Sequence, residues 1–176
     1  MNHPKPIRTT RHWWIPIALA SAMPPVTDAA PKYLGPSAVL ASPDGGRIFV
    51  ACADAAKVMA IDLASGKPGA SATVPGEPTG LALSPDGKIL YATCGIPDGV
   101  VCVIDPATMK VTGKIAAGHT PTGAAPHPDG KRLYVCNRFN NDVSVFDLAT
   151  KKEIRRIAVP REPFSAAVTP DGSPSP

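Results

Sequence analysis

One triplet, Pro-Asp-Gly, recurs along this chain at nearly constant spacing and constrains its fold more than any other feature. The four copies begin at Pro43, Pro85, Pro128 and Pro170, at separations of 42, 43 and 42 residues. Seven residues before each copy lies a further proline, and a short apolar segment connects the two. A fixed period of about 40 residues indicates one supersecondary unit that is copied along the chain.

Each repeat has the pattern of a small antiparallel sheet. An alternating run of β-branched and aromatic residues follows each of the first three triplets, and a second run ends in an aspartate, as in residues 143–147. Such runs, bounded by Gly, Pro, Asn and Asp, are typical of strands joined by tight turns. In each triplet proline restricts φ, aspartate caps the turn and glycine adopts the left-handed conformation. The structural turn residues are Pro43, Asp44, Gly45, Pro85, Asp86, Gly87, Pro128, Asp129 and Gly130.

Four short strands in about 42 residues is the size of one propeller blade. We therefore expect an all-β fold, a β-propeller of four-stranded antiparallel blades, with three blades plus the first strand of a fourth. The predicted partial propeller covers residues 31–172, with blades at about 36–76, 77–118 and 119–160, the start of the next at 161–172, and a disordered tail at 173–176. Because propellers close with about 4 to 8 blades, this array is incomplete, and its open ends favour self-association.

The N-terminus has the layout of a secretory signal peptide. Lys5, Arg8 and Arg11 precede an apolar run from Trp13 to Ala22, which small residues follow. That run is about half of the ~20 residues that a membrane span needs. We expect residues 1–30 to be a signal peptide and short linker, and the protein to be periplasmic or secreted. The alternative is an uncleaved signal that holds the chain at a membrane.

The charge balance argues against a nucleic-acid partner. Three of the 18 Lys and Arg residues lie in the predicted signal peptide, which leaves 15 against 14 Asp and Glu residues. A nearly neutral chain lacks the excess positive charge that contacts to phosphate require. We therefore expect a protein or a surface ligand as the partner, of unknown identity.

Cys94 and Cys102 form the most informative pair of polar residues. Alignment of the repeats places them opposite each other across the second hairpin, at a distance that suits a disulfide in an oxidising compartment. Two free, half-buried thiols are the alternative. His119 and His127 have no second ligand nearby, so we expect exposed loop residues, with no metal and no cofactor.

The run from Leu133 to Asp147, with its Cys-Asn-Arg-Phe-Asn-Asn-Asp segment, resembles the YVTN-family β-propeller repeat. The segment further resembles a bacterial, exported subgroup whose propellers often precede c-type cytochrome or di-haem peroxidase-like domains. This resemblance implies a propeller fold over residues 36–172. The chain contains no Cys-x-x-Cys-His motif, so haem is expected only if a downstream domain exists.

Two functions are compatible with these patterns. The first is an exported binding or scaffold module, in which the loops joining blades and hairpins such as 95–99 and 138–142 form one rim. Arg138, Phe139 and Asn140 are then the candidate partner-binding residues, with a merely structural hairpin as the alternative. The second is the propeller portion of a periplasmic c-type cytochrome or di-haem peroxidase-like electron-transfer protein. No catalytic motif is present, so we lean towards a protein without enzymatic activity.

Overall fold

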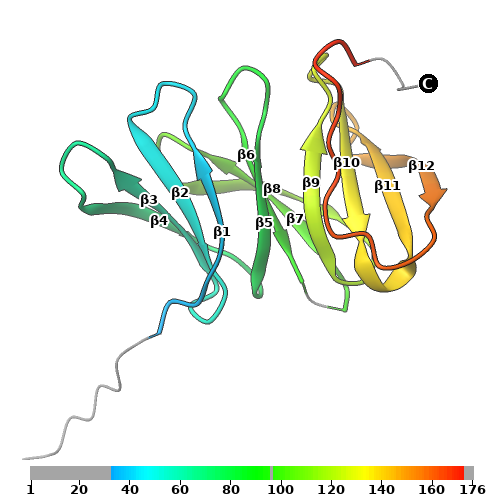
Figure 1. Ribbon diagram of the computed structural model, residues 1–176, viewed down its shortest axis with the longest axis horizontal. Coiled ribbons are helices and arrows are strands. Elements are labelled where there is room, and N and C mark those ends of the chain that lie inside the picture. Colours follow the sequence, from blue (N-terminus) through cyan, green and yellow to red (C-terminus); the bar gives the residue numbers. More distant parts are fainter. Residues whose placement is uncertain (1–32, 96, 173–176) are drawn as a thin grey trace, which may run out of the picture. The chain divides into compact units, whose positions relative to one another are not determined.

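The computed structural model describes residues 33–95 and 97–172, which form three four-stranded antiparallel sheets (Figure 1). The first sheet contains β1 (Pro36–Ala41), β2 (Arg47–Cys52), β3 (Lys57–Asp62) and β4 (Pro68–Thr73). The second contains β5 (Pro78–Leu83), β6 (Leu90–Cys94), β7 (Val100–Asp105) and β8 (Lys110–Ala116). The third contains β9 (Pro121–Pro126), β10 (Arg132–Asn137), β11 (Asp142–Asp147) and β12 (Lys152–Ala158), with the 3₁₀ helix η1 (Arg138–Asn140) between β10 and β11.

This arrangement confirms the predicted all-β architecture. In each sheet the strands follow one another in chain order, so every connection inside a sheet is a hairpin. The signal peptide predicted for residues 1–30 and the tail at 173–176 lie outside the described residues. Among the described residues, no helical segment has the length and hydropathy that a membrane span requires.

The Pro-Asp-Gly triplet forms the turn between the first and second strands of each sheet. In the second sheet the Ser84 hydroxyl bonds the Asp86 carboxylate at 2.6 Å and accepts the Ile89 N–H at 2.9 Å. Gly87 closes the turn at φ +68°, a value that residues with a side chain adopt only with strain. A hydroxyl two residues before the aspartate is therefore part of the turn, because it bonds both the aspartate and the next strand.

The sheets pack face to face in chain order, and their first strands β1, β5 and β9 lie side by side. We call the packed region between the first and second sheets the first junction, and that between the second and third sheets the second junction. The core of the first junction consists of Phe49, Val58, Ala60, Ala72, Val74, Leu90, Ala92, Cys94, Cys102, Ile104 and Met109. The core of the second consists of Ala82, Tyr91, Val101, Val103, Ile115, Leu133, Val135 and Phe146. Alternate residues of the second sheet thus serve both junctions, as strand geometry requires.

A repeated hydroxyl bond connects each first strand to the next repeat. The residue after the repeat's first proline donates its hydroxyl hydrogen to the carbonyl oxygen of the next repeat's proline. These bonds run from Ser37 to Pro78 at 2.5 Å, from Thr79 to Pro121 at 2.5 Å and from Thr122 to Pro163 at 3.0 Å. In the sequence these hydroxyl bonds correspond to a Pro-Ser or Pro-Thr pair at the start of each of the first three repeats, a pattern that the sequence analysis missed.

Residues 161–172 differ from the expected first strand of a fourth blade, because they form no hydrogen-bonded strand. They nevertheless lie where that strand was expected, since the carbonyl of Pro163 receives the Thr122 hydroxyl. The backbone of Phe164 also comes so close to Gly123 that a Cβ there would lie 2.8 Å from the Phe164 carbonyl oxygen. A strand needs a partner in its own sheet, and the described residues contain none after β12.

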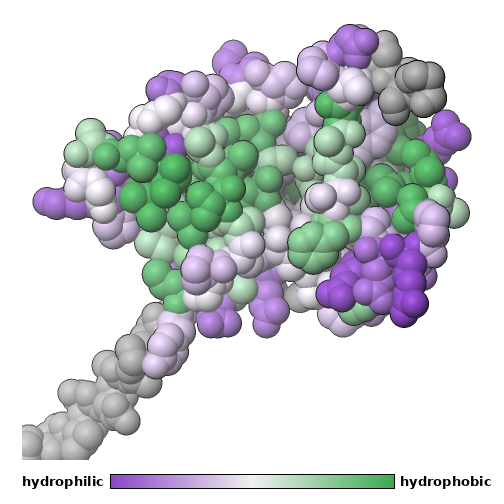
Figure 2. Space-filling model, viewed as in Figure 1, coloured by the Kyte–Doolittle hydropathy of each residue, from purple (hydrophilic) through white to green (hydrophobic). Residues whose placement is uncertain are grey.

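The first sheet has one face that no other described sheet covers. Val39 is 63% exposed on this face, and Met59 and Ile61 are half-buried. Figure 2 shows hydrophobic surface over β1 and β2. The expected self-association through such an open face stays a prediction.

Candidate functional site

The predicted rim lies at the end of the sheets opposite the Pro-Asp-Gly turns. There the loops that join consecutive sheets contact the hairpins between second and third strands. The Gly95 N–H donates to the Glu77 carbonyl at 2.9 Å, and the Arg138 N–H donates to the Thr120 carbonyl at 3.1 Å. The structure therefore brings together the two kinds of loop from which we expected a binding surface.

Arg138, Phe139 and Asn140 form η1 in this rim. Phe139 is 52% exposed, and the Arg138 guanidinium lies 5.1 Å from the centre of its ring. The His119 ring meets the Phe139 ring edge-on at 5.3 Å, and the His119 N–H donates to the Asn140 side-chain oxygen at 2.5 Å. Arg138 also donates to the Glu162 carboxylate at 3.0 Å. The aromatic ring is thus exposed on a loop that neighbouring groups hold in place.

Asn137 fixes the base of this hairpin. It is fully buried, and its amide donates to Asp142 and to Ser144, each at 2.7 Å. Its side-chain oxygen accepts the Gly118 N–H at 2.9 Å, which connects the hairpin to the preceding loop. We did not single out Asn137 from the sequence. The available signal was its repeat position, which Cys94 occupies in the second sheet.

Cys94 and Cys102 are neighbours on the face of the second sheet that packs in the first junction, but they are not directly opposed. Cys94 pairs with Val100 and Cys102 pairs with Ala92, so the predicted direct pairing is wrong and the two cysteines are diagonal neighbours. The reason is the shortness of the hairpin. Cys94 ends β6 and pairs with Val100, the first residue of β7, so Cys102 lies two residues beyond the position opposite Cys94.

The four cysteines at positions 52, 94, 102 and 136 are buried, free thiols in the structure. A hydrogen bond with the Cys102 thiol, together with burial, raises the pKa of Cys94. Cys94 is therefore protonated at neutral pH and weakly reactive. A disulfide between Cys94 and Cys102 stays a prediction.

His127 is buried, which contradicts the expected exposed loop residue. Its Nδ1 accepts the Asp129 N–H at 3.1 Å, and its Nε2 lies 3.1 Å from an Arg132 nitrogen. The imidazole thus takes the capping role that Ser84 has in the preceding turn. A hydrogen bond from the Lys131 backbone N–H lowers the pKa of Asp129 to about 2, and hydrogen bonds with the Arg132 and His127 side chains contribute further. Among the described residues, no group of three His, Cys, Asp or Glu could hold a metal ion.

The first junction is almost closed at the end that carries the Pro-Asp-Gly turns. The Arg47 guanidinium, from β2, donates to the Pro106 carbonyl of the second sheet at 2.8 Å. Met109 lies in the same turn as Pro106, is 3% exposed and is part of the core of this junction. The hollow that remains at this end has a volume of about 190 Å³.

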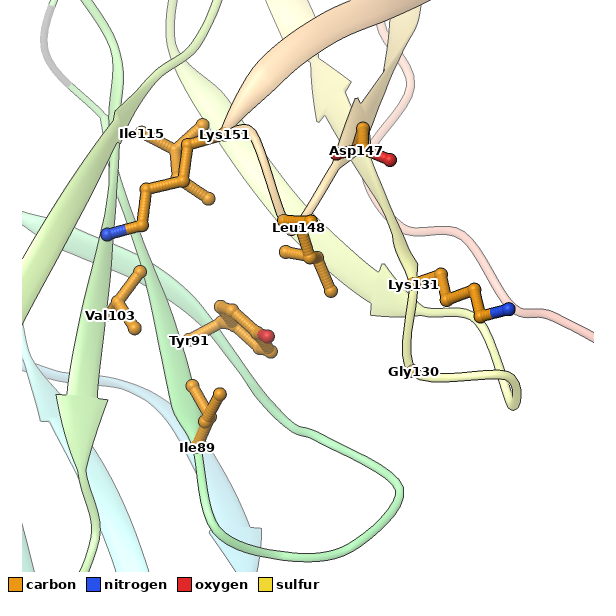
Figure 3. Close-up of a pocket in the computed structure, with 10 residues that line it drawn as sticks. Ile89, Tyr91, Val103, Ile115, Gly130, Lys131, Asp147, Leu148 and Lys151 are labelled. Atoms are coloured by element: carbon orange, nitrogen blue, oxygen red, sulfur yellow. The ribbon is translucent and has the colours of Figure 1, made fainter.

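The second junction contains a larger hollow at the same end. Ile89 occupies the repeat position of Arg47, and Lys151 that of Met109. The hollow has a volume of about 460 Å³, and an adjoining one of about 310 Å³ shares Ile89 and Tyr91 with it. Figure 3 shows Ile89, Tyr91 and Val103 on one side of the space and Leu148 on the other.

Comparison with solved structures supports the architecture. A chain from Kuenenia stuttgartiensis hydrazine synthase matches 80% of this chain with a TM-score of 0.74 and 28% identity. A candidate 6-phosphogluconolactonase from Bacteroides fragilis matches 76% with a TM-score of 0.68 and 24% identity. The WD40 repeats of RRP9 match 70% with a TM-score of 0.62 and 15% identity. The fold is that of a β-propeller.

These neighbours limit what can be transferred to this chain. The chain spans only 40%, 41% and 38% of those three solved chains, in the same order. No protein-family model matches the sequence, and neither does any curated protein. The three sheets are therefore blades of an incomplete propeller, and a role has to be argued from the site.

Proposed function

We propose that this chain is a binding module that recognises a protein partner through the rim around η1. The observation that carries the proposal is Phe139, an aromatic side chain that is 52% exposed yet held by His119 and Arg138. An exposed aromatic ring is the kind of residue that dominates protein–protein interfaces. A loop that is already ordered loses less conformational entropy when it binds.

The chemistry of the rim indicates which partner surface would fit. Around the apolar ring of Phe139 lie the half-exposed guanidinium of Arg138 and the exposed amide of Asn140. A partner with an apolar anchor bordered by hydrogen-bond acceptors would complement this arrangement. The Arg138–Glu162 ion pair is exposed, so it contributes to the orientation of the loop more than to binding energy.

The test uses a photo-crosslinking amino acid introduced at position 140, in the full chain expressed in its native host. We expect one predominant crosslinked protein, which is purified and titrated against the chain. Phe139→Ala then weakens binding by about tenfold or more, the effect of an interface hot spot. Leu63→Ala removes a side chain that is 49% exposed at the opposite end, and serves as the matched control. Equal affinity for the two variants contradicts the proposal.

We further propose export to the periplasm or the exterior, on the basis of the N-terminal sequence pattern. The test attaches an epitope to the C-terminus and measures the mass of the chain in each cell fraction. We expect the chain outside the cytoplasm and shortened to a start near Met23 or Pro31. A full-length chain in the cytoplasmic fraction contradicts export, and a full-length chain in the membrane fraction supports the uncleaved anchor.

A second candidate is the propeller portion of a periplasmic haem protein, a c-type cytochrome or a di-haem peroxidase-like electron-transfer protein. Its support is the resemblance of the Cys-Asn-Arg-Phe-Asn-Asn-Asp segment to the subgroup that often precedes haem domains. The 28% identity to a chain from hydrazine synthase, a protein that is named as an enzyme, is compatible with it. Reading the gene beyond the codon for Gly172 distinguishes the two candidates. Further blades followed by a Cys-x-x-Cys-His motif support the haem protein, and further blades without one support the binding module.

A further inference from the structure

The hollow in the second junction combines an apolar lining with two polar groups that have no hydrogen-bond or ion-pair partner among the described residues. We propose that it binds a small amphipathic carboxylate, with the carboxylate at Lys151 and Tyr91 and the apolar body between the blades. This site lies at the Pro-Asp-Gly end, away from the rim, and is independent of the function proposed above.

The apolar part of the site comes from both blades. Ile89, Val103 and Ile115 line it from the second blade and Leu148 lines it from the third. The volume of about 460 Å³ falls within the range of small-molecule sites, roughly 300 to 1,000 Å³. The corresponding hollow of the first junction, at about 190 Å³, is smaller than that range.

Tyr91 supplies the first polar group. The residue is 2% exposed, and its hydroxyl makes no hydrogen bond within the described residues. Every polar side-chain atom that the described residues enclose completely has a hydrogen-bond partner, so the Tyr91 hydroxyl, which has none, is not completely enclosed. Because Tyr91 lines the hollow, the hydroxyl is open to that space. Figure 3 shows the ring extending from β6 with its oxygen towards the side of Leu148. A buried tyrosine hydroxyl normally has a partner, which a ligand would supply here.

Lys151 supplies the charge. It lies in the turn between β11 and β12 with φ +57°, and its side chain extends across to β8 (Figure 3). Its ammonium lies over Gly113, where a Cβ would come within 2.7 Å of the nitrogen. No carboxylate of the described residues forms an ion pair with it. The ammonium is thus available to an anion at the edge of an apolar space.

The other charged residues of the lining are directed elsewhere. Asp147 accepts the backbone N–H and the hydroxyl of Thr150, each at 2.8 Å, within its own turn. Figure 3 shows the Asp147 carboxylate and the Lys131 ammonium directed away from the hollow.

One further carboxylate, that of Asp86, borders the adjoining hollow, and its charge adds to burial in raising the pKa of Tyr91. It accepts hydrogen bonds from the Ser84 hydroxyl and the Lys88 N–H within its own turn. An anion in the hollow would therefore meet one unpaired ammonium, and each carboxylate around it is already hydrogen-bonded in a turn. This charge arrangement favours a ligand with a carboxylate over a ligand with an amine.

The test titrates octanoate into the ¹⁵N-labelled chain and follows amide shifts by NMR, with 1-octanol as the uncharged probe of the same length. We expect saturable shifts centred on β6, β8 and the β11–β12 turn, and weaker binding of 1-octanol. Tyr91→Phe weakens octanoate binding by about fivefold, the net effect of one hydrogen bond. Lys151→Gln weakens it by about three- to tenfold, because the bond to a charged group is lost.

Two further variants separate the proposed site from non-specific effects. Lys131→Gln removes a charge that points away from the hollow and should leave octanoate binding unchanged. Ile89→Arg introduces the residue that the first junction has at this position, and should abolish binding while the melting temperature is kept. The proposal is overturned if octanoate gives no saturable shifts, if 1-octanol binds equally well, or if the two lysine variants have the same effect.

Discussion

The two blade junctions are built from the same repeat, yet one is closed at the Pro-Asp-Gly end and the other is hollow. Arg47 and Met109 close the first junction, through a bond to a carbonyl of the facing blade and a buried side chain. At the same positions the second junction has Ile89, whose side chain cannot donate a hydrogen bond, and Lys151, which is exposed. Two substitutions at equivalent positions therefore decide whether a blade junction serves stability alone or leaves room for a ligand.

The largest expected effect tests the closed junction at its buried side chain. Met109→Ala should lower the free energy of unfolding by about 2–5 kcal/mol, because it leaves a cavity in a packed core. Lys151→Ala, at the same repeat position, should change it by no more than about 0.5 kcal/mol. Urea denaturation of both variants measures the difference. Similar losses would show that the two junctions do not differ in packing.

The next effect concerns the bond that bridges the first junction. Arg47→Met keeps most of the apolar stem and removes the donor to the Pro106 carbonyl. We expect a loss of about 1–2 kcal/mol, because Arg47 is half-buried and the bond involves a charged group. Lys88→Met is the control, since that ammonium is exposed and only 3.9 Å from Asp86. If both variants lose the same stability, the bridge does not hold the junction closed.

The third prediction concerns the turn aspartates, which border both junctions. Hydrogen bonds in the turns lower the pKa of Asp44, Asp86 and Asp129, that of Asp129 to about 2. A carboxylate with a lowered pKa in the folded state stabilises the fold above its unfolded value of 3.8, and this contribution is lost as pH falls. Stability should therefore be constant from pH 7 to about 5 and fall between about pH 4 and 2.

Asp129→Asn provides the test of that pH dependence. The variant has no carboxylate to protonate at this turn, so its stability should fall less steeply between about pH 4 and 2 than that of the original chain. Thermal unfolding at a series of pH values measures both slopes. An unchanged slope would mean that Asp129 does not contribute to the acid sensitivity.

The smallest expected effect is at the glycine beneath Lys151. Gly113→Ala should change stability by no more than about 0.5 kcal/mol, because the new Cβ would come too close only to the end of a flexible lysine and would be in ordinary contact with Val103. Gly80→Ala is the contrasting variant in the same blade, since its Cβ would lie 2.5 Å from the Thr122 carbonyl oxygen. We expect a loss of about 1–3 kcal/mol there, because backbone atoms cannot move away freely. Thermal unfolding compares the two, and an equally large loss for Gly113→Ala would show that Lys151 is rigidly held.

Much of the fold was predictable from local patterns. The period of the triplets predicted three four-stranded sheets, and the loops predicted to form a rim do meet at one end. The fourth repeat was predicted less well, because residues 161–172 form a strand only if a neighbour pairs with them. His127 was also misjudged, since its burial depends on Arg132 and on the turn around it.

The candidate sites were predictable only in part. Phe139 and its neighbours were identified because an aromatic residue in a hairpin stands out in a sequence. Glu162, which holds Arg138 in position, lies 24 residues further along the chain and carries no local signal. The hollow was not predicted, since its walls combine residues of β6 to β8 with a turn more than 30 residues away.

The sequence by itself determined the blades, because strand alternation and turn chemistry act between residues that are close together in the chain. A proline, an aspartate and a glycine at a fixed spacing are enough to reverse a strand wherever they occur. Only the tertiary structure decided which face of each blade is filled. The volume left between two blades depends on side chains from both. Packing between repeats determines that Arg47 donates to the Pro106 carbonyl in the first junction, and that Ile89 and Leu148 line a hollow in the second.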